Sequence, residues 1–192
     1  IERVALGHAK RPLVITADRG RGKSTAIGQA LAQLSSQGKR VVLLAPTKQA
    51  VAAVFARLST LLPEHGLNGV TWRLPYAQIQ DPEPCDVLVV DEAASIPLPV
   101  LAALLQQHNR LVFSSTVHGY EGSGRGFALR FGKLLDQVMP QWQACQLTEP
   151  VRWAKDDPVE KLFNDILLLN VEQARVTRCT TEVRYRWLSQ AE

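Results

Sequence analysis

The sequence predicts an α/β fold in which a mostly parallel β-sheet lies between two layers of helices. Short apolar runs rich in β-branched residues alternate with amphipathic segments, which is typical of a parallel sheet wrapped by helices. One run leads into a glycine-rich loop and a helix, and a later run ends in two acidic residues. The 192 residues suffice for one well-packed domain, whereas two full domains would be cramped.

The first half of the chain predicts two strands, each followed by a helix. Residues 12–17 (PLVITA) form the first strand, and residues 22–38 form a helix closed by Gly38. Residues 40–47 (RVVLLAPT) form the second strand. The next helix has apolar residues at three- and four-residue steps. These residues are Val51, Val54, Phe55, Leu58 and Leu62.

After a turn over residues 63–69, the second half predicts further strands and helices. A strand that runs into two acidic residues is expected within residues 85–95. Further strands are expected at residues 110–117 and 144–153, with residues 182–188 as another candidate. Helices are expected from Pro97 and Pro99 through Leu105, at residues 127–138, and over a last apolar face of Val159, Leu162, Phe163, Ile166 and Leu167. The glycines of residues 118–126 predict a loop.

The stretch ADRGRGKS is a candidate phosphate-binding loop. Such a loop needs converging backbone N–H groups, a lysine for charge and a hydroxyl for magnesium, between a buried strand and a helix N-terminus. Gly20 and Gly22 supply permissive backbone, Lys23 the charge and Ser24 the hydroxyl. Ala17 replaces the first glycine of the G-x-x-x-x-G-K-[ST] pattern, and we expect the tight turn to tolerate it. A glycine-rich turn that only caps a helix is the alternative, which the order strand, loop, helix disfavours.

Two carboxylates end the run VLVV, where a strand beside the loop would end. An NTPase needs one carboxylate there to hold magnesium through its water shell, and often a second to polarise the attacking water. We assign Asp91 to magnesium, through water, and Glu92 as the general base. An acidic pair can simply terminate a strand, but the phosphate loop upstream favours the catalytic interpretation.

Two weaker stretches contain further candidates. The segment SSTVHGYEGSGRGF follows a strand, where a nucleotide-sensing loop would lie. Its polar candidates are Ser115, Thr116, His118, Glu121 and Arg125. For His118 alone, a solvated loop residue is the simpler interpretation. In TEPVRW, Arg152 follows an expected strand and could reach the terminal phosphate, although a surface salt bridge fits equally well.

Composition restricts the class of protein only loosely. The net charge of +4 suits contact with a polyanion, but the basic residues are scattered. Candidates for a basic surface are Arg19, Arg21, Arg125 and Arg130. The three cysteines, Cys85, Cys145 and Cys179, lack the spacing of a zinc site or disulfide framework, so we expect a reducing, cytoplasmic compartment. No apolar run approaches the ~20 residues of a membrane span, so no membrane partner is expected.

Together these stretches resemble the helicase-like ATPase module of the tRNA(Met) cytidine acetyltransferase family, which is similar to superfamily 1 helicases. The likeness rests on ADRGRGKS, VVDEAASIP, TVHGYEGSGRGF and PVRWAKDDPVEKL. The alanine also matches the A-x-x-G-x-G-K-[ST] loops of those helicases. The resemblance implies a RecA-like P-loop NTPase fold over residues 1–192, with its core at 11–170. Because the chain begins at Ile1 and ends without a closing turn, we expect a single domain excised from a longer chain.

The resemblance also implies an activity. Such enzymes use ATP, some also GTP, with acetyl-CoA to acetylate cytidine, in bacteria at the wobble position of elongator methionine tRNA. Hydrolysis would help present the RNA to an acetyltransferase domain elsewhere in the same protein. Asp91 and Ser24 would bind magnesium, and Glu92 would activate the attacking water. Arg152 would contact the nucleotide. The phosphates would be bound by Gly20, Arg21, Gly22, Lys23, Ser24 and Thr25, with Lys23 also counted among the catalytic residues.

Two other functions stay open. No acetyl-CoA loop of the Q/R-x-x-G-x-G/A kind and no second set of helicase motifs follows Arg152, so we expect acetyl-CoA to bind in a domain absent from this chain. The alanine-type loop also suits the motor lobe of a superfamily 1 DNA helicase. A nucleotide-dependent RNA clamp with little turnover is the third hypothesis.

Overall fold

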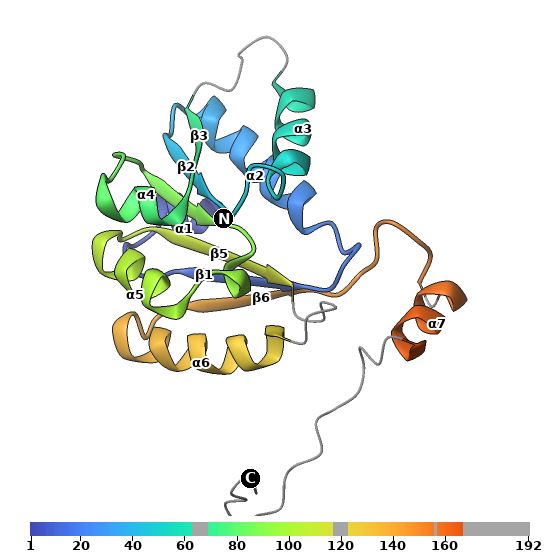
Figure 1. Ribbon diagram of the computed structural model, residues 1–192. Helices are drawn as coiled ribbons and strands as arrows, with labels where there is room; N and C mark the ends of the chain where they lie inside the picture. Colours follow the sequence, from blue (N-terminus) through green and yellow to red (C-terminus); the bar gives the residue numbers. More distant parts are fainter. Residues whose placement is uncertain (63–68, 117–122, 156, 167–192) are drawn as a thin grey trace, which may run out of the picture.

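The six strands of the structure form one parallel sheet. A computed structural model describes residues 1–62, 69–116, 123–155 and 157–166. The strands are β1 (Leu13–Ala17), β2 (Val41–Leu44), β3 (Val70–Arg73), β4 (Val87–Val90), β5 (Leu111–Thr116) and β6 (Gln143–Leu147). Their order across the sheet is β3-β2-β4-β5-β1-β6, and every neighbouring pair is parallel (Figure 1). The predicted α/β fold class is confirmed.

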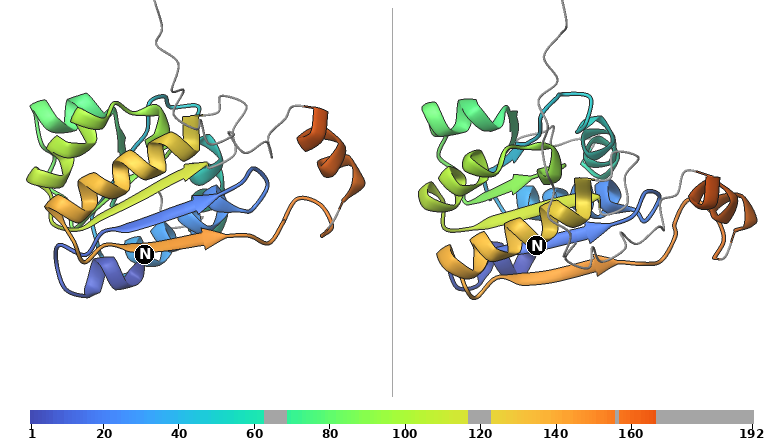
Figure 2. Two further views of the ribbon diagram at one scale, coloured as in Figure 1. Left: turned by 90° about the horizontal axis from the view of Figure 1, so that it is seen from below. Right: turned by 60° about the horizontal axis from the view of Figure 1, so that its bottom comes forward.

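Helices cover both faces of the sheet. The helical segments are α1 (Glu2–Leu6), α2 (Lys23–Ser36), α3 (Ala52–Leu61), α4 (Pro75–Gln80), the 3₁₀ turn η1 (Ala93–Ser95), α5 (Leu98–Gln107), α6 (Ser123–Val138) and α7 (Pro158–Ile166). The first three helices pack on one face and α4, α5 and α6 on the other (Figure 1). The helix α7 stands apart from both layers, beyond the end of β6 (Figure 2).

The central strands are apolar throughout because both of their faces are buried. In β4, Val87 and Val89 belong to the core under α2 and α3, whereas Leu88 and Val90 belong to the core under α5 and α6. All four residues are buried. Successive side chains of a strand point to opposite faces, so a strand between two helix layers needs no polar alternation.

Two predicted boundaries are corrected by the structure, and one is confirmed. The strand within residues 85–95 ends at Val90, directly before the acidic pair as expected, and Glu92 adopts a left-handed conformation with φ +51° that breaks the strand. The expected strand at 144–153 is only β6, since Pro150 has no N–H to donate and the chain bends after it. The helix α6 begins at Ser123 and so takes in glycines expected in a loop, because the packing of Phe127 and Phe131 in the core outweighs the weak helix propensity of glycine.

Other elements were not predicted. The helices α1 and α4 and the strand β3 span only five, six and four residues. Such segments are too short for a periodic pattern to distinguish them from loops. The predicted turn at 63–69, apart from Gly69, and the candidate strand at 182–188 lie outside the described residues.

Candidate nucleotide-binding site

The phosphate loop connects the end of β1 to the start of α2. Gly20 and Gly22 have φ values of +76° and +75°, which residues with a side chain rarely adopt. Gly22 precedes the first residue of α2, so the free N–H groups at the helix start face the loop. Ala17 is the last residue of β1 and is almost fully buried, and its φ is not positive. A glycine is therefore not required at that position, as we expected.

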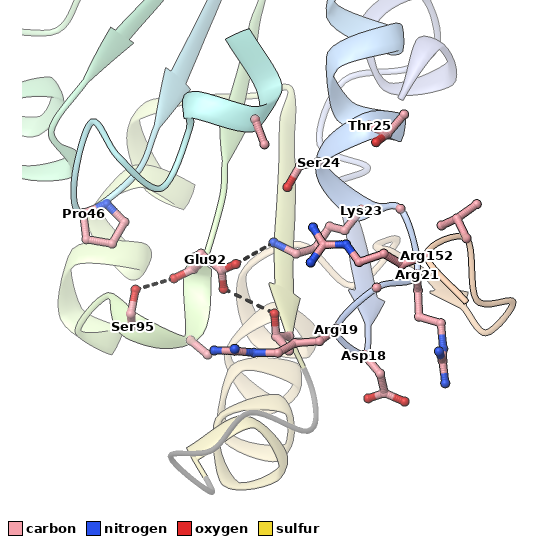
Figure 3. A pocket seen from close by; sticks show the side chains of 16 residues that line it. Asp18, Arg19, Arg21, Lys23, Ser24, Thr25, Pro46, Glu92, Ser95 and Arg152 are labelled. Atoms are coloured by element: carbon pink, nitrogen blue, oxygen red, sulfur yellow. Dashed lines mark hydrogen bonds and ion pairs between the residues drawn. The ribbon is translucent and has the colours of Figure 1, made fainter. Parts of the chain in front are cut away.

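Lys23 is buried and forms the centre of an ion cluster. Its Nζ lies 2.7 Å from Asp91 Oδ1 and 2.8 Å from Glu92 Oε1 (Figure 3 shows the contact with Glu92). Burial by itself lowers the pKa of Lys23, but the two carboxylates raise it, and the pKa is raised overall. This lysine therefore stays charged at neutral pH, and its contribution to stability is lost only as the pH rises through the raised pKa.

Asp91 is 1% exposed, and its two oxygens differ sharply. Oδ1 accepts hydrogen bonds from Lys23 Nζ, from Ser114 Oγ at 2.5 Å and from the Glu92 N–H at 3.0 Å. Oδ2 is buried and has no hydrogen-bond partner among the described residues. A buried carboxylate oxygen without a partner is costly, so Oδ2 is suited to a water molecule or a cation. This observation fits the predicted role of Asp91 at magnesium.

No all-protein metal site accompanies Asp91 in the described part of the chain, where no group of three or more His, Cys, Asp or Glu side chains gathers. Magnesium in nucleotide sites needs only one or two carboxylates, because substrate phosphates and water fill its other positions. The lack of a protein cage among these residues is therefore compatible with a magnesium ion held jointly by nucleotide and protein.

Glu92 is held in a strained conformation that points its side chain at Lys23. A non-glycine residue at φ +51° costs on the order of 1–3 kcal/mol unless neighbouring groups fix it. The Glu92 carbonyl accepts hydrogen bonds from Ser95 Oγ at 2.6 Å and from the Ser95 N–H at 3.0 Å (Figure 3). The Glu92 side chain remains 38% exposed. It is thus anchored through its backbone, while its carboxylate faces the cavity.

These groups line one cavity of about 620 Å³. The lining joins the phosphate loop, the start of α2, the turn after β4 and the segment after β6. The predicted residues in it are Arg19, Gly20, Arg21, Gly22, Lys23, Ser24, Thr25, Glu92, Thr116 and Arg152. The structure therefore brings together candidates that lie up to 133 positions apart in sequence, from Arg19 to Arg152. Asp91 is buried behind this surface, in contact with Lys23.

The remaining candidates are placed less centrally. Ser115 is buried at the end of β5, where its Oγ lies 3.4 Å from the Thr116 carbonyl. Arg130 is exposed on α6 and bonds the Gly126 carbonyl. His118, Glu121 and the side chain of Arg125 lie outside the described residues.

One candidate for the basic surface is corrected. Arg21 is only 13% exposed, and its Nη2 lies 2.8 Å from Glu160 Oε1 of α7. Because its charge is paired and mostly buried, Arg21 does not belong to an exposed basic surface.

Sequence analysis missed Ser114, which holds Asp91, and Glu160, which holds Arg21. The polar Ser114 within the apolar strand sequence LVFSST was the available signal for the first. No local pattern marks the second, because its partner is far away in sequence.

Comparisons with known proteins agree on one family. The family model described as RNA cytidine acetyltransferase NAT10/TcmA, helicase domain, matches residues 14–170. A tRNA(Met) cytidine acetyltransferase of Nitrosococcus halophilus is 42% identical, over 91% of this chain and 25% of its own length. The protein of the same name from Vibrio cholerae is 42% identical over 92% of this chain and 26% of its length.

A tRNA(Met) cytidine acetyltransferase of Thermofilum pendens is 40% identical over 88% of this chain and 24% of its length. The chain thus spans about a quarter of the length of the curated relatives it matches. In the described part of the chain, no helix is both long enough and apolar enough to cross a membrane.

Proposed function

We propose that this chain, which belongs to the RNA cytidine acetyltransferase NAT10/TcmA family by its helicase domain, binds and hydrolyses ATP, with GTP as an alternative. Hydrolysis would help present a tRNA, with elongator methionine tRNA as the expected substrate, for N4-acetylation of its wobble cytidine. The relatives are named as tRNA(Met) cytidine acetyltransferases. Acetyl-CoA would bind in an acetyltransferase domain outside this chain.

The observation that carries the ATPase proposal is the Lys23, Asp91 and Glu92 cluster beneath the phosphate loop. Lys23 Nζ lies within 2.8 Å of both carboxylates, in a cavity lined by the loop and the start of α2. A phosphate bound on the loop would compete with Glu92 for the lysine, because both are anions. Lys23 would then neutralise charge on the phosphates, and Glu92 would be free to accept a proton from water.

The chain's residues would act mainly by position and charge. Backbone N–H groups of the loop and of the α2 N-terminus would hold the phosphates, and the exposed Arg152, which also lines the cavity, would contact them too. Asp91 and Ser24 would hold magnesium, Asp91 through water. When bound, the ion supplies Lewis-acid neutralisation of phosphate charge. Glu92 would orient the water that attacks the γ-phosphate.

A test of this proposal needs the intact protein that contains the chain. Purified protein would be incubated with tRNA, acetyl-CoA and Mg-ATP, while phosphate release and acetylcytidine are measured, the latter by nucleoside mass spectrometry. We expect Lys23→Ala to abolish phosphate release and to lower acetylcytidine. Lys133→Ala, which removes an exposed lysine from α6, should leave both unchanged.

Three outcomes would contradict the proposal in different ways. Phosphate release that single-stranded DNA stimulates and tRNA does not would favour a DNA helicase. Tighter RNA binding in Mg-ATP with background phosphate release would favour a clamp. Acetylcytidine formation that is indifferent to Lys23→Ala would remove the coupling between this site and acetylation.

A further inference from the structure

The segment that follows β6 packs directly on the phosphate loop. The Val151 N–H donates to the Gly20 carbonyl at 2.9 Å. A Cβ placed on Gly20 would lie 2.4 Å from the Trp153 ring, and one on Gly22 would lie 2.7 Å from a Val151 methyl. Both glycines therefore lack a side chain for two reasons, their positive φ and this close contact. The indole ring thus covers the outside of the loop.

Glu160 connects this ring to the loop's arginine. Its Oε2 accepts a hydrogen bond from Trp153 Nε1 at 2.6 Å, and its Oε1 pairs with Arg21 Nη2 at 2.8 Å. The side chains of Arg21 and Glu160 are only 13% and 19% exposed. Charge-assisted hydrogen bonds are stronger than neutral ones, and partial burial shields them from water and salt. The Glu160 carboxylate therefore holds both Arg21, which belongs to the loop, and Trp153, which packs against it.

The start of α7 fixes the position of that carboxylate. Asp157 Oδ1 accepts hydrogen bonds from the Val159 N–H at 2.8 Å and from the Glu160 N–H at 3.2 Å. Asp157 is thus the N-cap of α7, with Pro158 at the first helical position, where its fixed φ suits the helix. Glu160 consequently lies in the first turn of the helix, at a defined place relative to the loop.

We propose that Trp153 and Glu160 are positioning residues that hold the phosphate loop in its nucleotide-binding conformation through Gly20 and Arg21. We call Arg21, Trp153 and Glu160 the loop latch. The proposal rests on the proposed function, because the latch would act on nucleotide affinity. A loop that is ordered before it binds loses less conformational entropy on binding, so a latched loop binds phosphates more tightly than a free one.

The latch also links the loop to α7. That helix has no buried residue, and among the described residues the contacts that join it to the phosphate loop include the ion pair with Arg21. A displacement of α7 would therefore pull on Glu160 and release Arg21 and Trp153 together. Nucleotide affinity would then depend on the position of α7.

Binding of a fluorescent ATP analogue to the intact protein would test the latch. We expect Glu160→Ala to raise the Kd about 10-fold or more, as the loss of a charge-assisted hydrogen bond implies. Glu160→Gln keeps an acceptor for Trp153 without the charge, and its Kd should lie between those of the wild type and Glu160→Ala. Trp153→Phe keeps the ring against Gly20 and should also weaken binding less than Glu160→Ala. The matched control is Asp165→Ala, which removes an exposed carboxylate from the same helix.

Three further readouts separate positioning from general stability. Arg21→Ala combined with Glu160→Ala should be no worse than the stronger single change, because both break the same pair. In Glu160→Ala, the KM for ATP should rise by a larger factor than kcat falls. Hydrogen–deuterium exchange of the peptide that contains residues 18–22 should accelerate without nucleotide, whereas peptides of β4 and β5 should not change.

The latch is overturned if the wild-type and Glu160→Ala proteins bind ATP equally well and their amide hydrogens exchange at the same rate over residues 18–22. Strictly additive effects of Arg21→Ala and Glu160→Ala would overturn it too. Wild-type protein that binds no ATP would instead overturn the proposed function itself, so the two failures are distinguishable.

Discussion

The centre of the sheet and its β6 edge both contact the phosphate loop, but they differ in how they are held. At the centre, β4 and β5 are buried on both faces, and Asp91 at the end of β4 is 1% exposed. At the edge, the first four residues of β6 are exposed, and α7 has no buried residue. The helix instead exposes an apolar stripe of Val159, Leu162, Phe163 and Ile166.

This difference suggests that the two regions have different roles. The groups assigned to chemistry are carried by the buried centre, where close packing allows only small displacements. The groups that contact the loop from outside are carried by the segment after β6, whose helix α7 has no buried residue and is therefore less constrained by packing. We therefore expect changes at the centre to damage catalysis or folding, and changes in the loop latch at the edge to alter nucleotide affinity more than catalysis.

The largest expected effect is on catalysis and tests the centre. Glu92→Gln should slow ATP hydrolysis by about 10²–10⁴-fold, the usual contribution of a general base, while ATP binding is retained. The matched change at the edge, Glu149→Gln, alters an exposed residue and should leave the rate unchanged. Phosphate release under single-turnover conditions would measure both. A wild-type rate in Glu92→Gln would show that another group activates the water.

A pair of identical substitutions tests the packing difference. Phe113→Ala should lower the free energy of unfolding by about 3–5 kcal/mol, because Phe113 is fully buried in β5 and its removal leaves a cavity. Phe163→Ala, at a residue 54% exposed on α7, should change it by at most about 0.5 kcal/mol. Denaturant unfolding would measure both values. Equal losses would mean that α7 is packed as firmly as the centre, and the comparison would fail.

Ser114 supplies a smaller test of the same kind. Ser114→Ala removes the hydroxyl that donates to the buried Asp91 carboxylate and should cost about 1.5–3 kcal/mol, as for hydrogen bonds to charged groups. Ser36→Ala removes an exposed hydroxyl that bonds a carbonyl at the end of α2 and should cost much less. Thermal unfolding of the two variants would rank them. If Ser114→Ala were as mild as Ser36→Ala, water would be replacing the lost donor.

The smallest expected effect is a difference in reactivity between the two described cysteines, which compares the centre with the edge without changing the fold. Burial raises the pKa of Cys85, next to β4, to about 11, whereas Cys145 is exposed on β6. In a Cys179→Ser background, iodoacetamide at pH 8 should alkylate Cys145 before Cys85. Mass spectrometry of the labelled peptides would measure the order, and earlier alkylation of Cys85 would contradict its burial.

The raised pKa of Cys85 also makes stability depend on pH. Because the folded state favours the neutral thiol, the stabilising contribution of Cys85 is present below about pH 9 and is lost as the pH rises toward 11.

Local patterns were sufficient for most of the fold and for the inner part of the site. The apolar runs around Val14, Val42 and Val89 predicted strands because buried parallel strands need no polar alternation. The glycine-rich loop before Lys23 and the acidic pair after Val90 predicted a nucleotide site, because phosphate and magnesium binding require those residue types at those places, and the structure brings Lys23, Asp91 and Glu92 together. The short elements β3 and α4 escaped prediction because too few residues carry a period.

What the sequence alone determined is therefore the order of the longer strands and helices, the glycine-rich loop before Lys23, and the position of Asp91 and Glu92 at the end of a strand. Only the tertiary structure decided that Ser114 holds Asp91 and that Glu160 reaches back to Arg21. The physical reason is that backbone conformation and hydrophobic periodicity are written in neighbouring residues. A contact between side chains 23 or 139 positions apart, from Asp91 to Ser114 and from Arg21 to Glu160, exists only once the parallel sheet has brought its strand ends to one edge.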